Sequence, residues 1–211
     1  MDVDSTLAAI EGVDWLASRR GEDVRAFVAG ATDRAMRGEI PLESVYAERL
    51  SAVAPSRADV EALSQAYVER LEAGAEESLA KLTNSGIRVV LVTGGIRDAI
   101  LPLALKLGLS RDDVNAVRVH FDRDGGYLGF DADSPLTRNG GKAEVARSLS
   151  LEHPILGVGD GNTDLELKSL SPPAVDAFAA YTGVVDRPGV SASADYVVHD
   201  FRELTRLVLG P

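Results

Sequence analysis

Two aspartates at alternate positions open the chain, in the segment DVDST at residues 2–6. Asp2 and Asp4 share one face of an extended backbone, and a loop can bring both carboxylates to one ligand. Two carboxylates with different tasks suit phosphoryl transfer through a covalent intermediate, in which one attacks phosphorus and the other moves protons. A solvated acidic segment is an equally good interpretation of these residues alone. A calcium loop is disfavoured, because Val13 occupies the position of its closing glutamate.

The strongest signal is the segment ILGVGDGNTD at residues 155–164. An apolar run with the pattern of a buried strand ends in Gly-Asp-Gly around Asp160, and Asp164 follows about one helical turn later. Carboxylates beside glycines at a strand end suit a hard cation, above all Mg²⁺. A dinucleotide-binding fingerprint is the competing interpretation, and it fails because Asn162 stands where the third glycine should be. The segment therefore predicts a metal site.

Two further segments offer a hydroxyl and a cation. VVLVTGGIR has Thr93, Gly94 and Gly95 between an apolar strand and a helix, where a hydroxyl and free backbone N–H groups could cradle a phosphate. Lys142 follows two glycines in NGGKAE, where it could neutralise phosphate charge. A plain strand-to-helix turn and a solvated lysine are the competing interpretations, and each is favoured when its segment is taken alone.

The elements that must position these residues predict an α/β fold with a parallel sheet. We expect helices over 13–20, 22–38, 41–54, 56–74, 76–86, 96–109, 142–153, 164–171 and 201–210. We expect strands over 87–95, 154–162 (ending in a glycine loop), 173–182 and 194–200, with a hairpin over 116–130. Ligands of open α/β sheets bind beyond the carboxyl ends of the strands. The segments Asp2–Thr6, Thr93–Gly95 and Asp160–Asp164 should therefore meet at one place.

Composition restricts the class of partner. The 211 residues fit one large domain, or a core with a smaller insertion. The formal net charge of −11 disfavours nucleic acid and anionic lipid as partners. The absence of cysteine excludes disulfides, thiol catalysis and zinc–thiolate sites and fits the cytoplasm. No run approaches the ~20 apolar residues of a membrane span, and the acidic N-terminus is unlike a signal peptide.

The order Asp-x-Asp-x-Thr, strand-Thr, Lys, Gly-Asp-Gly-x-x-Asp resembles the haloacid dehalogenase (HAD) superfamily of phosphatases and, within it, the phosphoserine phosphatase family. The likeness covers nearly the whole chain, including RAMRGEIPLESVYAERL, YLGFDADSPLTRNGGK and VDAFAAYTGVVDRPGV. It implies a Rossmann-like three-layer HAD core with a parallel sheet at residues 1–10 and 75–211. A small helical cap domain, residues 11–74, would be inserted after the first motif. The implied activity is Mg²⁺-dependent hydrolysis of O-phospho-L-serine through an aspartyl phosphate, the last step of serine biosynthesis.

The resemblance also implies a role for individual residues. Asp2 would be the nucleophile and Asp4 the general acid and base, with Lys142 beside them. Mg²⁺ would be held by Asp2, by the backbone carbonyl of Asp4 and by Asp160, with Asp164 supporting these ligands and Lys142. The substrate-binding residues would be Glu11, Met36, Arg49, Thr93, Gly94, Gly95, Lys142, Thr163 and Arg187. The family usually has serine at position 93, and threonine keeps its hydroxyl.

Arg49 can also be judged from its own helix. The apolar residues of PLESVYAERLSAV, such as Val45 and Val53, share one helical face, and Arg49 falls inside that stripe. An unpaired charge there is expensive. Pattern alone favours an arginine with its head in water. The resemblance reverses that preference, and predicts a guanidinium aimed at a substrate carboxylate, with Glu11 facing a substrate ammonium.

One feature departs from the family. An apolar strand normally leads into the first aspartate, whereas here Met1 alone precedes Asp2. We expect such a loss to leave unpaired backbone edges and an open core. The favoured explanation is a start codon upstream of Met1, and the alternative is a genuinely shortened chain.

Two other functions stay open. One is a HAD phosphatase or phosphotransferase that acts on another small phosphate monoester, such as phosphohomoserine or phosphoethanolamine. The other is a non-catalytic phosphate-binding module that lacks the first strand. In each case we expect a cytoplasmic monomer or homodimer with a small-molecule ligand, and neither nucleic acid nor membrane as partner.

Overall fold

The computed structural model describes residues 1–36 and 42–210. Its α-helices are α1 Gly12–Ser18, α2 Glu22–Met36, α3 Leu42–Val53, α4 Arg57–Glu69, α5 Ala75–Asn84, α6 Arg97–Lys106, α7 Gly141–Ser148, α8 Asn162–Ser169, α9 Pro188–Ser191 and α10 Phe201–Leu209. Its strands are β1 Leu91–Ile96, β2 Val114–Val117, β3 Val119–Phe121, β4 Tyr127–Phe130, β5 Leu156–Gly159, β6 Ala177–Tyr181 and β7 Tyr196–Val198. Two short 3₁₀ helices are η1 Arg111–Asp113 and η2 Pro135–Thr137. The expected α/β class is confirmed.

Two parallel sheets form the centre of the molecule. Strand β1 pairs with β2, and β5, β6 and β7 pair in that order, all in parallel. The first two residues join the two sheets. Val92 N–H donates to the Met1 carbonyl (3.0 Å), and Asp2 N–H donates to the Val158 carbonyl (2.9 Å). The terminal ammonium of Met1 donates to the Val90 carbonyl at 2.9 Å. The backbone of Met1 and Asp2 is thus inserted between β1 and β5.

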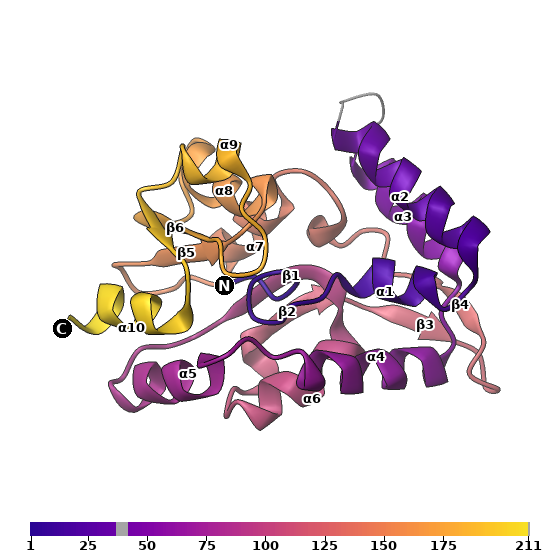
Figure 1. Ribbon diagram of the computed structural model, residues 1–211, viewed down its shortest axis with the longest axis horizontal. Coiled ribbons are helices and arrows are strands. Elements are labelled where there is room, and N and C mark those ends of the chain that lie inside the picture. Colours follow the sequence, from indigo (N-terminus) through magenta and orange to yellow (C-terminus); the bar gives the residue numbers. More distant parts are fainter. Residues whose placement is uncertain (37–41, 211) are drawn as a thin grey trace.

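Helices cover both faces of these sheets (Figure 1). In that view α5 and α6 lie below β1 and β2, and α8 and α9 lie above β5 and β6. Helix α10 packs on α5 and β7. Strands β5 and β6 have small or apolar side chains because helices cover them on both sides. A buried cluster then runs through the interior from Val3 and Leu7 to β1, α4, α6 and α10.

The four helices after the first segment do not form one uniform layer. Helices α2 and α3 pack on each other and project from the sheets, whereas α4 packs on α6 (Figure 1). Ser56 caps the start of α4: its hydroxyl accepts from Asp59 N–H, and the Asp59 carboxylate accepts from Ser56 N–H. The antiparallel hairpin β3–β4 reaches α3 and α4, where Phe130 meets Tyr46 and Arg57 lies over Phe121. The boundaries predicted for the cap domain, 11–74, stay a prediction.

Several expected bounds are wrong: the helix expected over 56–74 ends at Glu69, and the strand expected over 173–182 begins at Ala177. Strand β1 begins at Leu91 rather than at 87, because Leu91 pairs with Val114, where its partner β2 begins. Residues 116–117, expected in the hairpin, belong to β2, whose four residues are too few for a periodic pattern. The helix expected over 142–153 ends at Ser148. Within the described ranges, no helix combines the length and apolar character that crossing a membrane requires.

Candidate active site

Three carboxylates and one ammonium group meet where β5 ends beside the first residues. One oxygen each of Asp2, Asp160 and Asp164 lie within 4.8 Å of one another, and all three residues are buried. Nζ of Lys142, also buried, lies 2.9 Å from Asp2 Oδ1 and donates to Asp164 Oδ1 at 2.8 Å. Four residues from three distant parts of the chain therefore form one charged cluster, at the place where the sequence predicted a metal site.

Glycines make room for this cluster. A Cβ on Gly159 would lie 2.2 Å from Cγ of Asp164, and one on Gly141 would lie 1.6 Å from the Pro135 carbonyl oxygen. Gly159 ends β5, so the Asp164 carboxylate can fold back over the strand end. There it accepts from Gly161 N–H (3.1 Å) and caps α8. Gly141 lets η2 lie directly on the first turn of α7, which carries Lys142.

The charges of the cluster are not balanced by the protein itself. Burial, and then the charge of Asp2, raises the pKa of Asp164 to about 7, against the opposing effect of Lys142. Burial and Asp2 likewise raise the pKa of Asp160. Burial would lower the pKa of Lys142, but Asp164 and Asp2 outweigh it and raise that pKa. The three carboxylates thus form ion pairs with the ammonium group of Lys142 and, at the rim, with the guanidinium group of Arg187.

The donor set fits a hard divalent cation. Asp2 Oδ1 is buried and makes no well-aligned hydrogen bond with any residue in the described part of the chain. Carboxylate oxygens are the ligands that Mg²⁺ or Ca²⁺ prefers, and the Lys142 ammonium 2.9 Å away is the charged neighbour that a cation would join. A cation among Asp2, Asp160 and Asp164 would also offset the charge of Asp2, which together with burial raises the pKa values of Asp160 and Asp164.

Asp4 lies beside this cluster and has a different environment. Its Oδ1 accepts a 2.6 Å hydrogen bond from the hydroxyl of Tyr67, on α4. Burial and the charge of Glu11 raise the pKa of Asp4 well above its ordinary value, and the Tyr67 hydrogen bond opposes that rise. Burial and Asp4 raise the pKa of the Tyr67 hydroxyl, so it remains a donor. Two carboxylates with different settings therefore lie side by side.

The Thr93–Gly95 segment differs from its expected form. It lies within β1, at an irregularity in the pairing with β2, rather than in a loop after the strand. Gly95 N–H is not free, because it donates to Oγ1 of buried Thr93 at 3.1 Å. The carbonyl of Gly94 accepts from the hydroxyl of Tyr46, on α3, at 2.8 Å. The predicted cradle thus retains the Thr93 hydroxyl and the Gly94 backbone, with Gly95 N–H orienting that hydroxyl.

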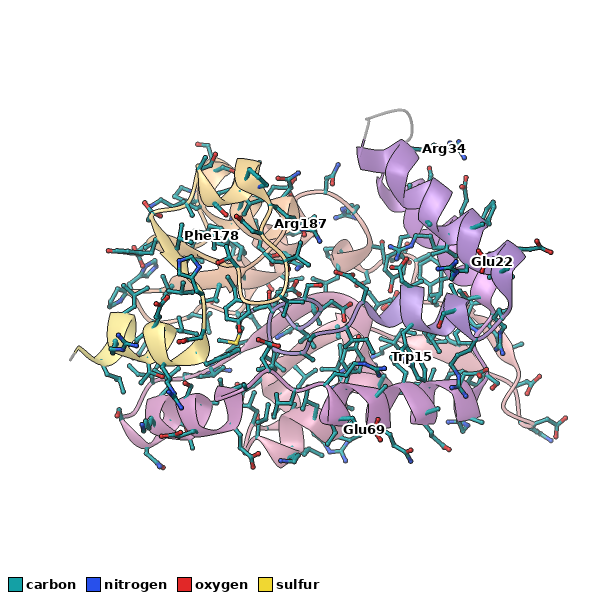
Figure 2. The ribbon with its side chains drawn as sticks, viewed as in Figure 1. Trp15, Glu22, Arg34, Glu69, Phe178 and Arg187 are labelled. Carbon is teal, nitrogen blue, oxygen red and sulfur yellow. The ribbon has the colours of Figure 1, made fainter. Side chains whose placement is uncertain are left out.

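Arg187 closes one side of the cluster. Its Nε donates to Asp160 Oδ2 at 3.0 Å, and its Nη2 lies 3.8 Å from Glu11. Arg187 lies on the side of the α9 segment that faces the cap helices (Figure 2). Glu11, in turn, accepts from the Ser5 hydroxyl at 2.7 Å, and is partly exposed. Thr163, in the first turn of α8, is half-buried.

Arg49 is half-buried, and its head already has a partner within the protein. Its side chain is 17% exposed, and Nη2 forms an ion pair with Asp14 of α1. Nε of Arg49 is buried and finds no hydrogen-bond partner among the residues that the structure describes. The interpretation with the guanidinium in water is therefore wrong. Met36 ends α2, and its side chain lies outside the described part of the structure.

Several polar neighbours of the site gave no usable signal in the sequence. Three of them are helical residues: Tyr46, Tyr67 and Asp14. In a helix, sequence alone indicates a core position for a tyrosine and a surface position for an aspartate. Their contacts with the site depend on tertiary structure alone. By contrast, the hydrogen bond that Thr6 Oγ1 donates to Asp160 Oδ1 (3.2 Å) joins two segments that the sequence predicted to meet.

Replacing Gly159 with alanine tests the packing of the cluster. The new Cβ would overlap Asp164, so we expect the carboxylate to move and Lys142 to lose its partner. Overpacking of this kind costs about 1–3 kcal/mol of unfolding free energy, which lowers Tm by several degrees in a chain of this length. Gly189→Ala is the matched control, since nothing lies within 4 Å of its Cβ. Equal melting temperatures of the two variants would contradict the packing described here.

The chain is similar to known proteins in both sequence and structure. A family model of haloacid dehalogenase-like hydrolases matches residues 1–168. The chain is 39% identical over 206 residues to a chloroplastic phosphoserine phosphatase of Arabidopsis thaliana, covering 96% of this chain and 68% of the relative. It is 37% identical to the Homo sapiens phosphoserine phosphatase, covering 96% and 89%. The phosphoserine phosphatase of Halobacterium salinarum is 33% identical, covering 98% and 94%.

Solved structures give the same result. A substrate-bound phosphoserine phosphatase complex matches with a TM-score of 0.76 and 25% identity, covering 98% of this chain and 95% of that chain. A phosphoserine phosphohydrolase-like protein from Francisella tularensis has a TM-score of 0.86 at 24% identity, covering 99% and 97%, and this likeness shows the fold.

Proposed function

Because this chain belongs to the haloacid dehalogenase-like hydrolases and, within them, to the phosphoserine phosphatase family, we propose that it hydrolyses O-phospho-L-serine to L-serine and phosphate. One observation supports this most directly: Asp2, Lys142, Asp160 and Asp164 meet at the end of β5, with Asp4 beside them. Phosphoryl transfer to a carboxylate needs a nucleophile, a proton carrier and concentrated positive charge, and this cluster can supply all three once it holds a cation.

The cation in this proposal is Mg²⁺. Asp2, the backbone carbonyl of Asp4 and Asp160 would hold it, while Asp164 supports Lys142. When bound, Mg²⁺ supplies charge stabilisation to the oxygens of the phosphoryl group. Lys142 adds a second positive charge, which helps an acidic protein with a net charge of −11 to accept an anionic ester.

The first chemical step forms the aspartyl phosphate. A carboxylate oxygen of Asp2 forms a bond to phosphorus while the bond from phosphorus to the serine oxygen breaks, in line with the attack. The electron pair of the broken bond stays on the serine oxygen, and the protonated carboxyl of Asp4 gives that oxygen its proton. Thr93 and Gly94 hold the phosphoryl oxygens, and the Gly95 N–H orients the Thr93 hydroxyl.

The second step returns the enzyme to its starting form. Asp4, now ionised, takes a proton from water, and the water oxygen attacks phosphorus. The bond between phosphorus and the Asp2 oxygen breaks, and its electrons return to the carboxylate. Phosphate leaves, and Asp4 is again protonated for the next cycle.

Recognition of the amino acid part falls to the rim of the site. Arg49 would bind the substrate carboxylate and Glu11 the ammonium, with Met36, Thr163 and Arg187 lining the remainder. The buried Nε of Arg49, which has no partner among the described residues, supports this role, because a carboxylate would satisfy it. The cap helices α2 and α3 would exclude water when they close on the substrate. Tyr46, which donates to the Gly94 carbonyl, supports such closure by linking α3 to β1.

Arg49→Ala tests the substrate assignment. We expect kcat/KM for phosphoserine to fall by about 100-fold, the effect of losing a charge-assisted hydrogen bond to a carboxylate. Phosphoethanolamine lacks that carboxylate, so its kcat/KM should change only a few-fold. Asp14→Asn is the control, since it breaks the same ion pair but keeps the guanidinium. Equal losses for both esters in Arg49→Ala would remove its role in specificity.

Phosphate release from a panel of esters tests the function itself. Phosphoserine, phosphohomoserine and phosphoethanolamine are compared in the presence of Mg²⁺, with Asp2→Asn protein as the blank. Preference for phosphoserine supports the proposal. Preference for either other ester would show that this ester is the substrate, within the same family. Folded protein that hydrolyses none of the three would favour a non-catalytic phosphate-binding module. A cytoplasmic location and a monomeric or homodimeric state stay predictions of the sequence.

A further inference from the structure

A buried tyrosine outside the steps above contacts the aspartate that moves the proton. Tyr67 has no exposed surface, and its hydroxyl donates to Asp4 Oδ1 at 2.6 Å. We propose that Tyr67 is a positioning residue that holds the Asp4 carboxyl group with its other oxygen, Oδ2, toward the phosphoryl group. The role rests on the proposed function, because it concerns the proton that Asp4 delivers to the leaving oxygen.

Two glycines define the space in which this hydrogen bond forms. A Cβ on Gly12 would lie 2.3 Å from Oη of Tyr67. A Cβ on Gly95 would lie 3.4 Å from that Oη and 3.5 Å from Asp4 Oδ2. Gly12 begins α1, and Gly95 belongs to the Thr93–Gly95 segment of β1. The tyrosine hydroxyl thus reaches Asp4 only because Gly12 has no side chain, and the free oxygen of Asp4 faces the phosphate-binding segment.

The ring of Tyr67 gives this contact its rigidity. The residue belongs to the buried cluster that α4 forms with α6 and the first segment, and Leu63 packs beside it at Gly12. A ring held in a close-packed interior has little freedom to turn. Asp4, by contrast, lies in the irregular segment between Val3 and Ser5, where Ser5 has a positive φ of 52°. A fixed donor on a helix therefore restrains a carboxylate on a loop.

A satisfied core tyrosine is the alternative to a positioning role. In that case the hydroxyl only finds the nearest acceptor, and its removal would lower stability without selecting among substrates. The two roles differ in how they depend on the leaving group. The serine oxygen is a poor leaving group and needs the proton of Asp4, whereas p-nitrophenolate leaves without one. The parameter kcat/KM covers every step up to release of that group, so it reports the proton delivered by Asp4.

Tyr67→Phe removes the hydroxyl and keeps the ring. We expect kcat/KM for phosphoserine to fall by about 10- to 100-fold, a part of the usual contribution of a general acid. For p-nitrophenyl phosphate, kcat/KM should stay within about 3-fold. The KM for phosphoserine should change little, because Tyr67 does not touch the amino acid part. During turnover of p-nitrophenyl phosphate, a larger fraction of Tyr67→Phe protein than of wild-type protein should carry the phosphoryl group. The reason is that Asp4 must still activate the water that hydrolyses the aspartyl phosphate.

Matched variants separate positioning from stability. Tyr181→Phe is the control, because Tyr181 is equally buried and its hydroxyl donates to Glu72 at 2.7 Å, away from the cluster. It should lose stability without distinguishing the two esters. Gly12→Ala keeps the Tyr67 hydroxyl but pushes it from its place, and should reproduce the selective loss. It also serves as the test if Tyr67→Phe does not fold.

A double-variant comparison completes the test. If Tyr67 acts through Asp4, adding Tyr67→Phe to Asp4→Asn should cause little further loss of kcat/KM for phosphoserine. If the two residues act independently, the fold-losses of the single variants should multiply in the double variant. Equal losses on both esters, an unchanged kcat/KM for phosphoserine, or multiplicative losses in the double variant would each overturn the proposal. A wild-type protein that hydrolyses the nitrophenyl ester but not phosphoserine would instead overturn the proposed function. The Tyr67 comparison would then be made with an alkyl phosphate that the protein does hydrolyse.

Discussion

Asp2→Asn lowers turnover of phosphoserine by roughly 10⁴-fold or more, which is the usual result of removing a catalytic nucleophile. The amide oxygen of asparagine cannot form an acyl phosphate, so the two-step route is closed. The backbone position should not change, because Asp2 N–H donates to the Val158 carbonyl in either protein. The loss should therefore appear in kcat, with the protein still folded.

Two measurements check this result. Acid-quenched wild-type protein should carry a phosphoryl group after mixing with phosphoserine, and Asp2→Asn protein should carry none. The intact mass must show that the asparagine has not deamidated, because a small amount of restored aspartate would mimic residual activity. Asp23→Asn, at an exposed position of α2, is the control and should keep full turnover. Substantial activity in pure Asp2→Asn protein would falsify the nucleophile assignment.

Loss of the metal has the second-largest expected effect. Chelation should abolish turnover, and added Mg²⁺ should restore it. Asp160→Asn should reduce kcat/KM by about 10³-fold, because it removes one of the charged oxygens that hold the cation and its contribution to charge stabilisation. Asp133→Asn, at an exposed position before η2, is the control.

The same metal should be visible in stability. A ligand that binds only the folded protein adds about 2.7 kcal/mol to the unfolding free energy at 100 times its dissociation constant. Mg²⁺ should therefore raise the melting temperature of the wild-type protein, and this rise should be much smaller in Asp160→Asn. Without Mg²⁺, Asp160→Asn should lose less stability relative to the wild type than it does with Mg²⁺. In the metal-free wild type, burial and the charge of Asp2 already disfavour the ionised Asp160 carboxylate and raise its pKa, and the substitution removes that cost. A wild-type melting temperature that does not change when Mg²⁺ is added would contradict the assigned metal site.

The parts of the site that could be predicted from sequence are those with a local cause. Gly159, Asp160 and Asp164 are neighbours in sequence, and their strand-glycine-helix pattern already limits the backbone to one arrangement. The cap of α4 at Ser56 is local in the same way. The pattern around Lys142 gave only a weak candidate, and the family resemblance implied its place beside the aspartates; its contact with Asp164 spans 22 residues. The structure does place that ammonium group between Asp2 and Asp164.

The remainder depends on contacts that no window of sequence contains. The Tyr67–Asp4 hydrogen bond spans 63 residues, and the Arg49–Asp14 pair spans 35. Gly95 N–H was expected to be free, because a pattern of residue types does not show which acceptor lies nearest. Strand β2 was missed because its parallel partner is more than twenty residues away and its four residues carry no period of their own.

The insertion of Met1 and Asp2 between β1 and β5 also has a consequence for how the protein is made. The partner of Asp2 N–H is Val158, so the nucleophile can take its place only after the residues up to Val158 have left the ribosome. At about 5–20 residues per second, this delay is on the order of 10–30 s. During that time Met1 can already pair with Val92, but Asp2 N–H has no partner and the two sheets cannot be joined. The catalytic centre should therefore assemble late in synthesis, rather than act as the nucleus from which folding starts.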